Sequence, residues 1–120
     1  MAHSLLTTVI GSFPKPEYLP IEDWFDAARN EGAMNSDRVT ENFTKYQENT
    51  KESDEQLFIK AAEEVISLQI NSGIDIPTDG EVRRENYVHY HCRYLNGFDF
   101  KNLERRVFRD GAYDSHLPAI

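Results

Sequence analysis

The sequence has little cysteine, little positive charge and no long apolar run. Its 120 residues include one cysteine, and 13 basic residues face 21 acidic ones, for a net charge of −8. Cys92 alone excludes an internal disulfide and favours a reducing, cytoplasmic setting. The apolar stretches are a few residues long, whereas a membrane helix needs about 20, and no secretory signal opens the chain. The acidic balance argues against a nucleic-acid-binding module, which requires a basic surface.

What is present is enough apolar material for a packed core. Hydrophobic residues make up 39% of the chain and aromatic residues 12%, which predicts one globular unit. Charge is uneven, with a net of −9 over residues 1–80 and +1 over residues 81–120. This pattern indicates a solvated acidic helical layer followed by a neutral segment. In the alternative interpretation, some arginines of the second part contact an anion.

The first 31 residues predict a strand and a short helix. Residues 5–10 are apolar and β-branched and stop at Gly11, which is typical of a strand buried on both faces. Residues 21–31 place Trp24, Phe25 and Ala28 at helical spacing, with acids in the first turn and a glycine after the end.

Two longer helices are predicted next. Residues 36–50 carry one apolar stripe, formed by Val39, Phe43 and Tyr46. Residues 53–72 begin with Ser53 and Gln56 in capping-box spacing and end before Gly73, a left-handed cap position. The broad apolar face of this helix contains Leu57, Phe58, Ala61, Ala62, Val65, Ile66 and Ile70.

A second strand and a hairpin complete the expected elements. Residues 74–79 follow the helix directly, and a strand–helix–strand crossover joins parallel strands. Asp110-Gly111 is a turn signal that predicts a hairpin over about residues 105–114. The fold class is therefore α/β, and the shortage of strands suggests the N-terminal part of a (β/α)₈ barrel completed by further chain or by a partner. A small independent α+β domain is the alternative.

Polar residues follow both predicted core strands. The first strand ends in Gly11-Ser12 and the second in Asp79-Gly80-Glu81. Ligands of parallel α/β folds bind at the carboxyl ends of the strands, so these two segments are the candidate binding site. Asp79 and Glu81 are also a candidate carboxylate pair for acid–base catalysis, although such pairs often serve as solvated or capping groups.

These same two segments resemble a known family. Thr7 to Pro14, read as Thr-Thr-Val-Ile-Gly-Ser-Phe-Pro, resembles the opening of the catalytic barrel of cobalamin-independent methionine synthase. Residues 79–88, Asp-Gly-Glu-Val-Arg-Arg-Glu-Asn-Tyr-Val, are similar to the motif of that family's second strand, and more so to its short, single-barrel homologues. The order of the two motifs, on either side of a long helical crossover, adds to the resemblance.

The resemblance implies a fold, an activity and a site. It implies a barrel of the uroporphyrinogen-decarboxylase and methionine-synthase type, of which this chain is about the first third. The family transfers a methyl group from methyltetrahydrofolate to the sulfur of homocysteine and uses zinc. By motif, Ile10, Gly11 and Ser12 fall on the homocysteine-binding turn and Glu81 on the acidic residue that holds the same amino acid. Backbone N–H groups and a hydroxyl suit a carboxylate, and Glu81 suits an ammonium group.

This chain departs from the family pattern in two ways. Asp79 stands where the long enzymes have histidine, and the family's zinc ligands belong to a later part of the barrel. A free thiol with a pKa near 8.5 is mostly protonated at neutral pH, so methyl transfer to sulfur needs a metal or another means of forming the thiolate. We expect the 120 residues alone to be inactive and to carry no catalytic residue and no metal ligand.

Other interpretations remain open at this stage. His89, His91 and Cys92 include ligand types suited to zinc, but packing or hydrogen bonding near the barrel mouth is the alternative. Arg83 and Arg84 are possible contacts for an anionic substrate, with surface salt bridges as the alternative. A different function is also consistent with the shortage of strands. The chain would then be a non-catalytic assembly module that acts by self-association.

Overall fold

The computed structural model describes residues 5–23, 36–111 and 113–120. It contains α1 (Ser36–Glu48), α2 (Glu52–Asn71), α3 (His89–Cys92), β1 (Asp99–Phe108), the short 3-10 turn η1 (Arg109–Gly111) and β2 (Tyr113–Ala119). The chain forms two compact units, a first unit of residues 1–20 and 51–83 and a second unit of residues 21–50 and 84–120. Within the described ranges, no helix has the length and apolar character needed to cross a membrane.

Helix α2 is the centre of the first unit. It buries Phe58, Ala61, Val65 and Gln69 on one face, as its helical spacing predicts. The capping box differs from the prediction, because the helix begins at Glu52 and the Asp54 carboxylate accepts a hydrogen bond from the Lys51 N–H at 3.0 Å. Gly73 has φ +83° and ends the helix in the predicted left-handed conformation.

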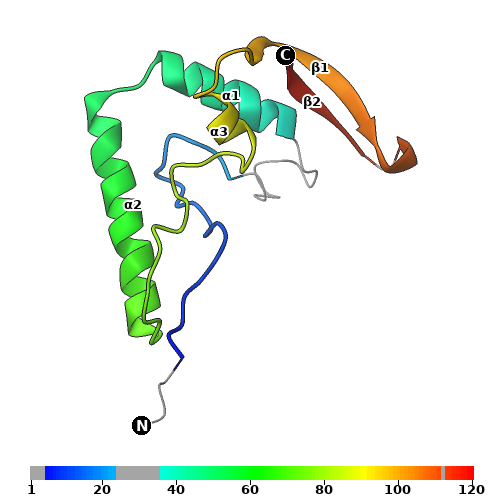
Figure 1. Cartoon of the computed structure of the whole chain (residues 1–120). Helices are drawn as coiled ribbons and strands as arrows, with labels where there is room; N and C mark the ends of the chain where they lie inside the picture. Colours follow the sequence, from blue (N-terminus) through cyan, green and yellow to red (C-terminus); the bar gives the residue numbers. More distant parts are fainter. Residues whose placement is uncertain (1–4, 24–35, 112) are drawn as a thin grey trace. The chain divides into compact units, whose positions relative to one another are not determined.

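The two predicted strands of the first unit are reduced to one bridge. Residues 5–10 and 74–79 pair in parallel only at Thr8 and Ile76, so the direction is as predicted but the strands are not formed. Burial on both faces is also wrong, since Leu6 is 70% and Ile10 100% exposed. The physical reason is that neither segment has a further strand beside it in the described part of the chain, and a parallel pair needs neighbours and covered faces. Figure 1 shows the segment that follows α2 turning back beside the helix, and the bridge places the first segment next to it.

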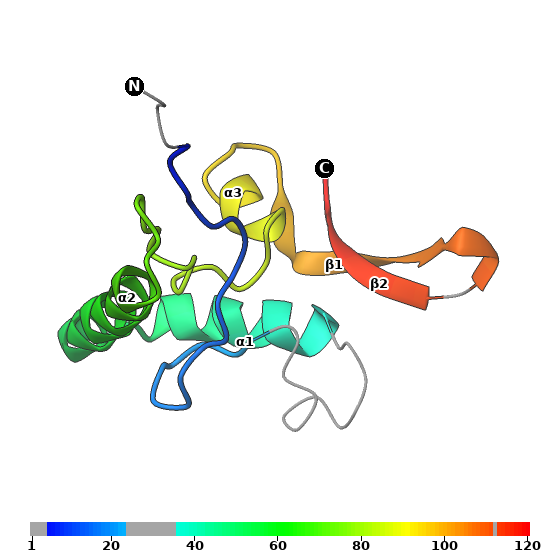
Figure 2. The same cartoon turned by 90° about the horizontal axis from the view of Figure 1, so that it is seen from below.

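The second unit combines α1, α3 and a hairpin. Val39 and Phe43 of α1 are buried as the apolar stripe predicts, and the rings of Phe43 and Tyr90 are 6.5 Å apart. Strands β1 and β2 are antiparallel, with Phe108 opposite Tyr113. Figure 2 shows this hairpin as a two-stranded arm.

The hairpin agrees with its predicted turn and exceeds its predicted length. Asp110 and Gly111 have positive φ, as the predicted turn requires. Arg109 also has positive φ and Phe108 pairs with Tyr113, so the connection spans residues 109–112 and is longer than a turn at Asp110-Gly111 alone. The strands extend from Asp99 to Ala119, beyond the predicted range of about 105–114. The predicted helix over 36–50 corresponds to α1, which ends at Glu48. The helix predicted over 21–31 lies outside the described residues from residue 24 onward, and residues 21–23 are not helical.

Candidate functional site

The structure places the two predicted strand ends beside each other in the first unit. We call Ile10, Gly11, Ser12, Asp79, Gly80 and Glu81 the strand-end cluster. The Phe13 N–H donates to the Gly80 carbonyl at 2.9 Å. Phe13 lies three residues beyond the end of the first predicted strand, and Gly80 lies one residue beyond the end of the second. Residues separated by more than sixty positions along the chain therefore meet at one hydrogen bond.

A second set of bonds holds the same two segments together nearer their beginnings. The Asp75 carboxylate accepts hydrogen bonds from both the N–H and the hydroxyl of Thr7, each at 2.8 Å. These bonds stabilise the ionised carboxylate, so the pKa of Asp75 lies below its ordinary value. The Ile76 N–H donates to the Thr7 carbonyl at 3.0 Å. The crossover is thus fastened on both sides of the single bridge.

The backbone of the strand-end cluster has an uncommon conformation. Gly80 and Glu81 are both left-handed, with φ of +65° and +56°. The Glu81 N–H donates to the Asp79 carboxylate at 2.9 Å, and the Gly80 N–H donates to the Thr78 hydroxyl at 3.2 Å. One oxygen of Asp79 thus supports the turn on which Glu81 lies, as expected of a capping group.

Gly80 is also held by close packing. A β-carbon at this position would lie 2.6 Å from Val65 Cγ1 and 3.1 Å from Phe13 Cβ. Val65 of α2 and Phe13 therefore pack so closely against the Gly80 backbone that they leave no room for a side chain. The glycine in Asp79-Gly80-Glu81 has a packing reason as well as a conformational one.

The remaining predicted residues occupy different environments. Ser12 is exposed, and its hydroxyl lies 3.4 Å from the Phe13 carbonyl and 3.5 Å from Lys15 Nζ. Arg83 forms two hydrogen bonds with the Glu55 carboxylate of α2, at 2.7 and 2.8 Å, and stacks on Phe58. This hydrogen bonding lowers the pKa of Glu55.

Arg84 belongs to the second unit and is half-buried. Of the two predicted anion contacts, Arg83 forms a salt bridge with Glu55, which was the alternative interpretation. Its guanidinium engages a carboxylate of its own chain rather than facing solvent alone.

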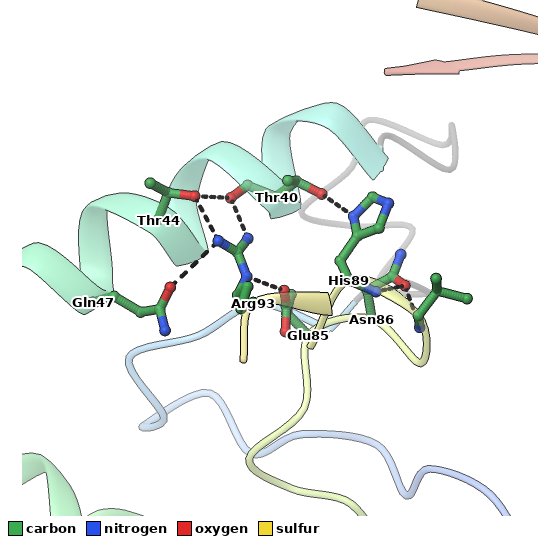
Figure 3. A network of polar contacts seen from close by, with 8 residues as sticks. Thr40, Thr44, Gln47, Glu85, Asn86, His89 and Arg93 are labelled. Carbon is green, nitrogen blue, oxygen red and sulfur yellow. Dashed lines mark hydrogen bonds and ion pairs between the residues drawn. The ribbon is translucent and has the colours of Figure 1, made fainter. Parts of the chain in front are cut away.

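The second unit contains a buried ion pair that the sequence did not reveal. Arg93 Nε donates to the Glu85 carboxylate at 2.9 Å, with side-chain exposures of 6% and 0% (Figure 3). The guanidinium also donates to the Thr44 hydroxyl at 3.0 Å and to the Thr40 carbonyl at 3.2 Å. It stacks on Phe100 at 4.1 Å, so Arg93 joins α1, α3 and β1.

The Glu85 carboxylate is incompletely satisfied. Its second oxygen, Oε2, has no hydrogen-bond partner among the residues that the structure describes. Burial raises the pKa of Glu85, and the hydrogen bond and charge of Arg93 oppose that rise without cancelling it. A buried pair of this kind contributes little net stability, because removing both charges from water is costly.

Residues 89–92 form one helical turn that holds the unit together. His89 is buried, with Nδ1 3.1 Å from the Thr40 hydroxyl and its ring against Phe100. The Asn86 side chain accepts from the N–H groups of Val88 and His89 at 2.8 and 3.0 Å, which caps this turn (Figure 3).

Residues 5–23, 36–111 and 113–120 contain no group of three His, Cys, Asp or Glu side chains placed to hold a metal ion. The structure therefore shows packing and hydrogen bonding at His89. The described residues do not provide a set of ligands that fits zinc.

Sequence reasoning missed four residues whose buried polar side chains the structure uses. Glu85 and Asn86 lie within the motif over residues 79–88, but the sequence indicates no role for them, and Arg93 is one of several basic residues in the second part of the chain. Gln69 was omitted because it is polar, although it lies on the buried face of α2 at the spacing of Phe58 and Val65. A polar residue at an apolar-face position is the signal that would have found it.

The comparisons with known proteins agree with the motifs. The chain belongs to the family described as "Cobalamin-independent synthase, Catalytic domain", which matches residues 5–110 and confirms the predicted resemblance. It is 33% identical over 109 residues to the methionine synthase of Sulfolobus acidocaldarius, covering 91% of this chain and 26% of that protein.

A methionine synthase of Saccharolobus islandicus is 32% identical over 96 residues, covering 80% of this chain and 24% of the relative, and that of Saccharolobus solfataricus has the same values. The chain thus spans about a quarter of the length of the curated relatives it matches. No solved structure matches it significantly.

Proposed function

We propose that this chain supplies the amino-acid-binding part of a methionine-synthase-type methyltransferase. The reaction would move a methyl group from methyltetrahydrofolate to the sulfur of homocysteine. Family membership and relatives called methionine synthase support the reaction class. The chain would form the first strands and helices of a barrel of the uroporphyrinogen-decarboxylase and methionine-synthase type, acting in the cytoplasm.

The strand-end cluster is the proposed homocysteine site. In this proposal the backbone of Ile10, Gly11 and Ser12 and the Ser12 hydroxyl meet the substrate carboxylate, while Glu81 pairs with its ammonium group. The observation that carries the proposal is the bond from Phe13 N–H to the Gly80 carbonyl, because it brings the two motifs together. A ligand with both charges at one carbon needs an anion-binding group and a carboxylate a short distance apart.

The chemistry at sulfur is assigned to other residues. The thiol of free homocysteine is mostly protonated at neutral pH, and zinc held by those residues would lower its pKa so that the thiolate forms. The described residues contain no group of ligands for it. The chain's own part is therefore to bind and orient the amino-acid end of homocysteine.

The site is tested by titrating L-homocysteine into the ¹⁵N-labelled chain and following amide shifts by NMR. We expect saturable shifts at Gly11, Ser12 and Glu81. Glu81→Ala should weaken binding by roughly 10- to 100-fold, because a hydrogen bond to a charged group is worth about 1.5–3 kcal/mol. N-acetyl-homocysteine, which lacks the ammonium group, should lose as much affinity with the unchanged chain.

The matched control is Glu63→Ala, an exposed glutamate on α2. It removes the same charge from the first unit and should leave the homocysteine affinity unchanged. Equal affinity in the Glu81→Ala chain, or shifts confined to residues outside the strand-end cluster, would contradict the proposed site.

A second candidate function is assembly. Apolar side chains around the single bridge are exposed, with Leu5 at 92% and Ile76 at 51%, and the paired backbone offers unpaired edges to another strand. We propose that further barrel strands cover this edge, and that the 120-residue chain uses it for self-association when it is alone. Light scattering over a range of concentrations should show mass rising above 13.9 kDa. A monomer at all concentrations would refute the association.

A further inference from the structure

Gln69 is a buried polar side chain that the proposed site does not yet use. It is 2% exposed and lies on the apolar face of α2 with Ala61 and Val65. Burial of an amide is costly unless its donors and acceptor are paired. Gln69 meets this requirement with three hydrogen bonds, of which two go to the backbone of a single residue.

The arrangement of these bonds resembles the pairing of a neighbouring strand. Gln69 Nε2 donates to the Thr78 carbonyl at 2.8 Å, and the Thr78 N–H donates to Gln69 Oε1 at 3.0 Å. The second Nε2 bond, to the Val65 carbonyl at 3.0 Å, fixes the amide against its own helix. The side chain therefore satisfies both backbone groups of Thr78, at a place where the strand predicted over 74–79 is not formed.

The backbone that follows Thr78 is held in sequence. The Thr78 hydroxyl accepts from Gly80, Asp79 accepts from Glu81, and the Gly80 carbonyl accepts from the preceding motif at Phe13. Glu81 at the end of this series keeps a left-handed conformation that a glutamate rarely adopts. Such a conformation persists where the surroundings determine it, and Gln69 is the point at which the series is fastened to the helix.

We propose that Gln69 is a positioning residue for the amino-acid-binding site: its amide holds the Thr78 backbone, and thereby fixes the turn that presents Glu81 to the ligand. This inference rests on the proposed function, since Glu81 is the ligand contact only there. In this proposal Gln69 increases the affinity for the substrate by positioning Glu81 and does not itself contact the substrate.

The test compares Gln69→Met with Gln56→Met. Methionine fills a similar volume without polar atoms, and Gln56 is an exposed glutamine of the same helix. Far-UV circular dichroism first establishes that both variants are folded. Amide hydrogen exchange at Thr78 and Glu81, and the Kd for L-homocysteine from NMR titration, are then measured on the full chain.

We expect exchange at both amides to be faster by at least about fivefold in Gln69→Met, the effect of losing one hydrogen bond. The homocysteine Kd should rise by a similar or larger factor. Gln56→Met should change neither quantity. Faster exchange with unchanged affinity would overturn the positioning role. Unchanged exchange would show that the Gln69 amide does not hold the Thr78 backbone.

A second variant keeps the test decisive if Gln69→Met does not fold. In Gln69→Glu, the protonated side chain retains one donor and one acceptor for Thr78, whereas the ionised side chain has acceptors only. Relative to the unchanged chain at each pH, homocysteine binding and Thr78 protection should be close to normal in acid and fall as pH rises. A ratio independent of pH would contradict the proposal.

The failure of the proposed function is separately visible. If the unchanged chain does not bind homocysteine, the amino-acid site and the role of Gln69 in it are both refuted. The exchange rates of the two variants still report whether Gln69 holds the backbone.

Discussion

Replacement of Gly80 by alanine should destabilise the chain more than any other glycine-to-alanine change at a described position. The new β-carbon would lie 2.6 Å from Val65 Cγ1, a distance that requires the helix or the turn to move. Forcing an extra carbon into a packed site costs about 1–3 kcal/mol. The left-handed φ of +65° adds about 1–2 kcal/mol for a residue with a β-carbon. We therefore expect a loss of about 2–5 kcal/mol in the free energy of unfolding.

Gly73→Ala separates the two contributions. Gly73 also has a left-handed φ, +83°, but a β-carbon there would meet nothing within 4 Å. This control should lose only the conformational part, about 1–2 kcal/mol. Urea unfolding followed by circular dichroism measures both variants against the unchanged chain.

A double variant identifies the clash directly. Adding Val65→Ala to Gly80→Ala removes the Cγ1 atom that the new β-carbon meets, so the two changes together should cost less than their sum. If Gly80→Ala is no more destabilising than Gly73→Ala, the close approach of α2 to the strand-end cluster is refuted.

Three further predictions concern charged groups. Arg93→Ala should cost about 3–5 kcal/mol in urea unfolding because it leaves the Glu85 carboxylate buried without its partner, whereas Arg83→Ala, at a largely exposed pair, should cost no more than about 1 kcal/mol. Since the pKa of Glu85 is raised in the folded state, its contribution to stability is present below its unfolded pKa and is lost as pH rises through the folded value, so Glu85→Gln should flatten the pH profile of unfolding above about pH 4.5. Asp75 has the opposite sign: its lowered pKa gives stability that is present above its unfolded pKa near 3.8 and lost in acid, and Asp75→Asn should reduce the slope of acid unfolding.

The sequence was most informative where the signal was local. Helix α2 follows from an apolar face with helical spacing and from Gly73 after its end. The hairpin turn follows from Asp110-Gly111, because few residue pairs accept consecutive left-handed conformations. Each of these signals lies within the element it specifies, so no knowledge of distant residues is needed.

The predictions were weakest where structure depends on what lies across the fold. Residues 5–10 have the composition of a buried strand, but composition cannot say whether a neighbour is there to pair with it, and only the Thr8–Ile76 bridge is formed. The prediction missed the first part of β1. Residues such as Lys101 and Asn102 are polar and the strand lacks a regular apolar–polar alternation, so its sequence carries little strand signal. The Arg93–Glu85 pair depends on a turn between them that placed both inside the second unit.

The motif over residues 79–88 divides into two parts with different tasks. Glu85 and Asn86 are buried, and their side chains are used within the second unit, on Arg93 and on the first turn of α3. In the first part, Asp79 and Glu81 are less buried and lie on the turn that meets Phe13. Burial keeps the Glu85 and Asn86 side chains away from solvent, so they are poorly placed to meet a ligand. Likeness to the family across the whole motif therefore reflects architecture in its second half, and the proposal of substrate binding rests on the first half alone.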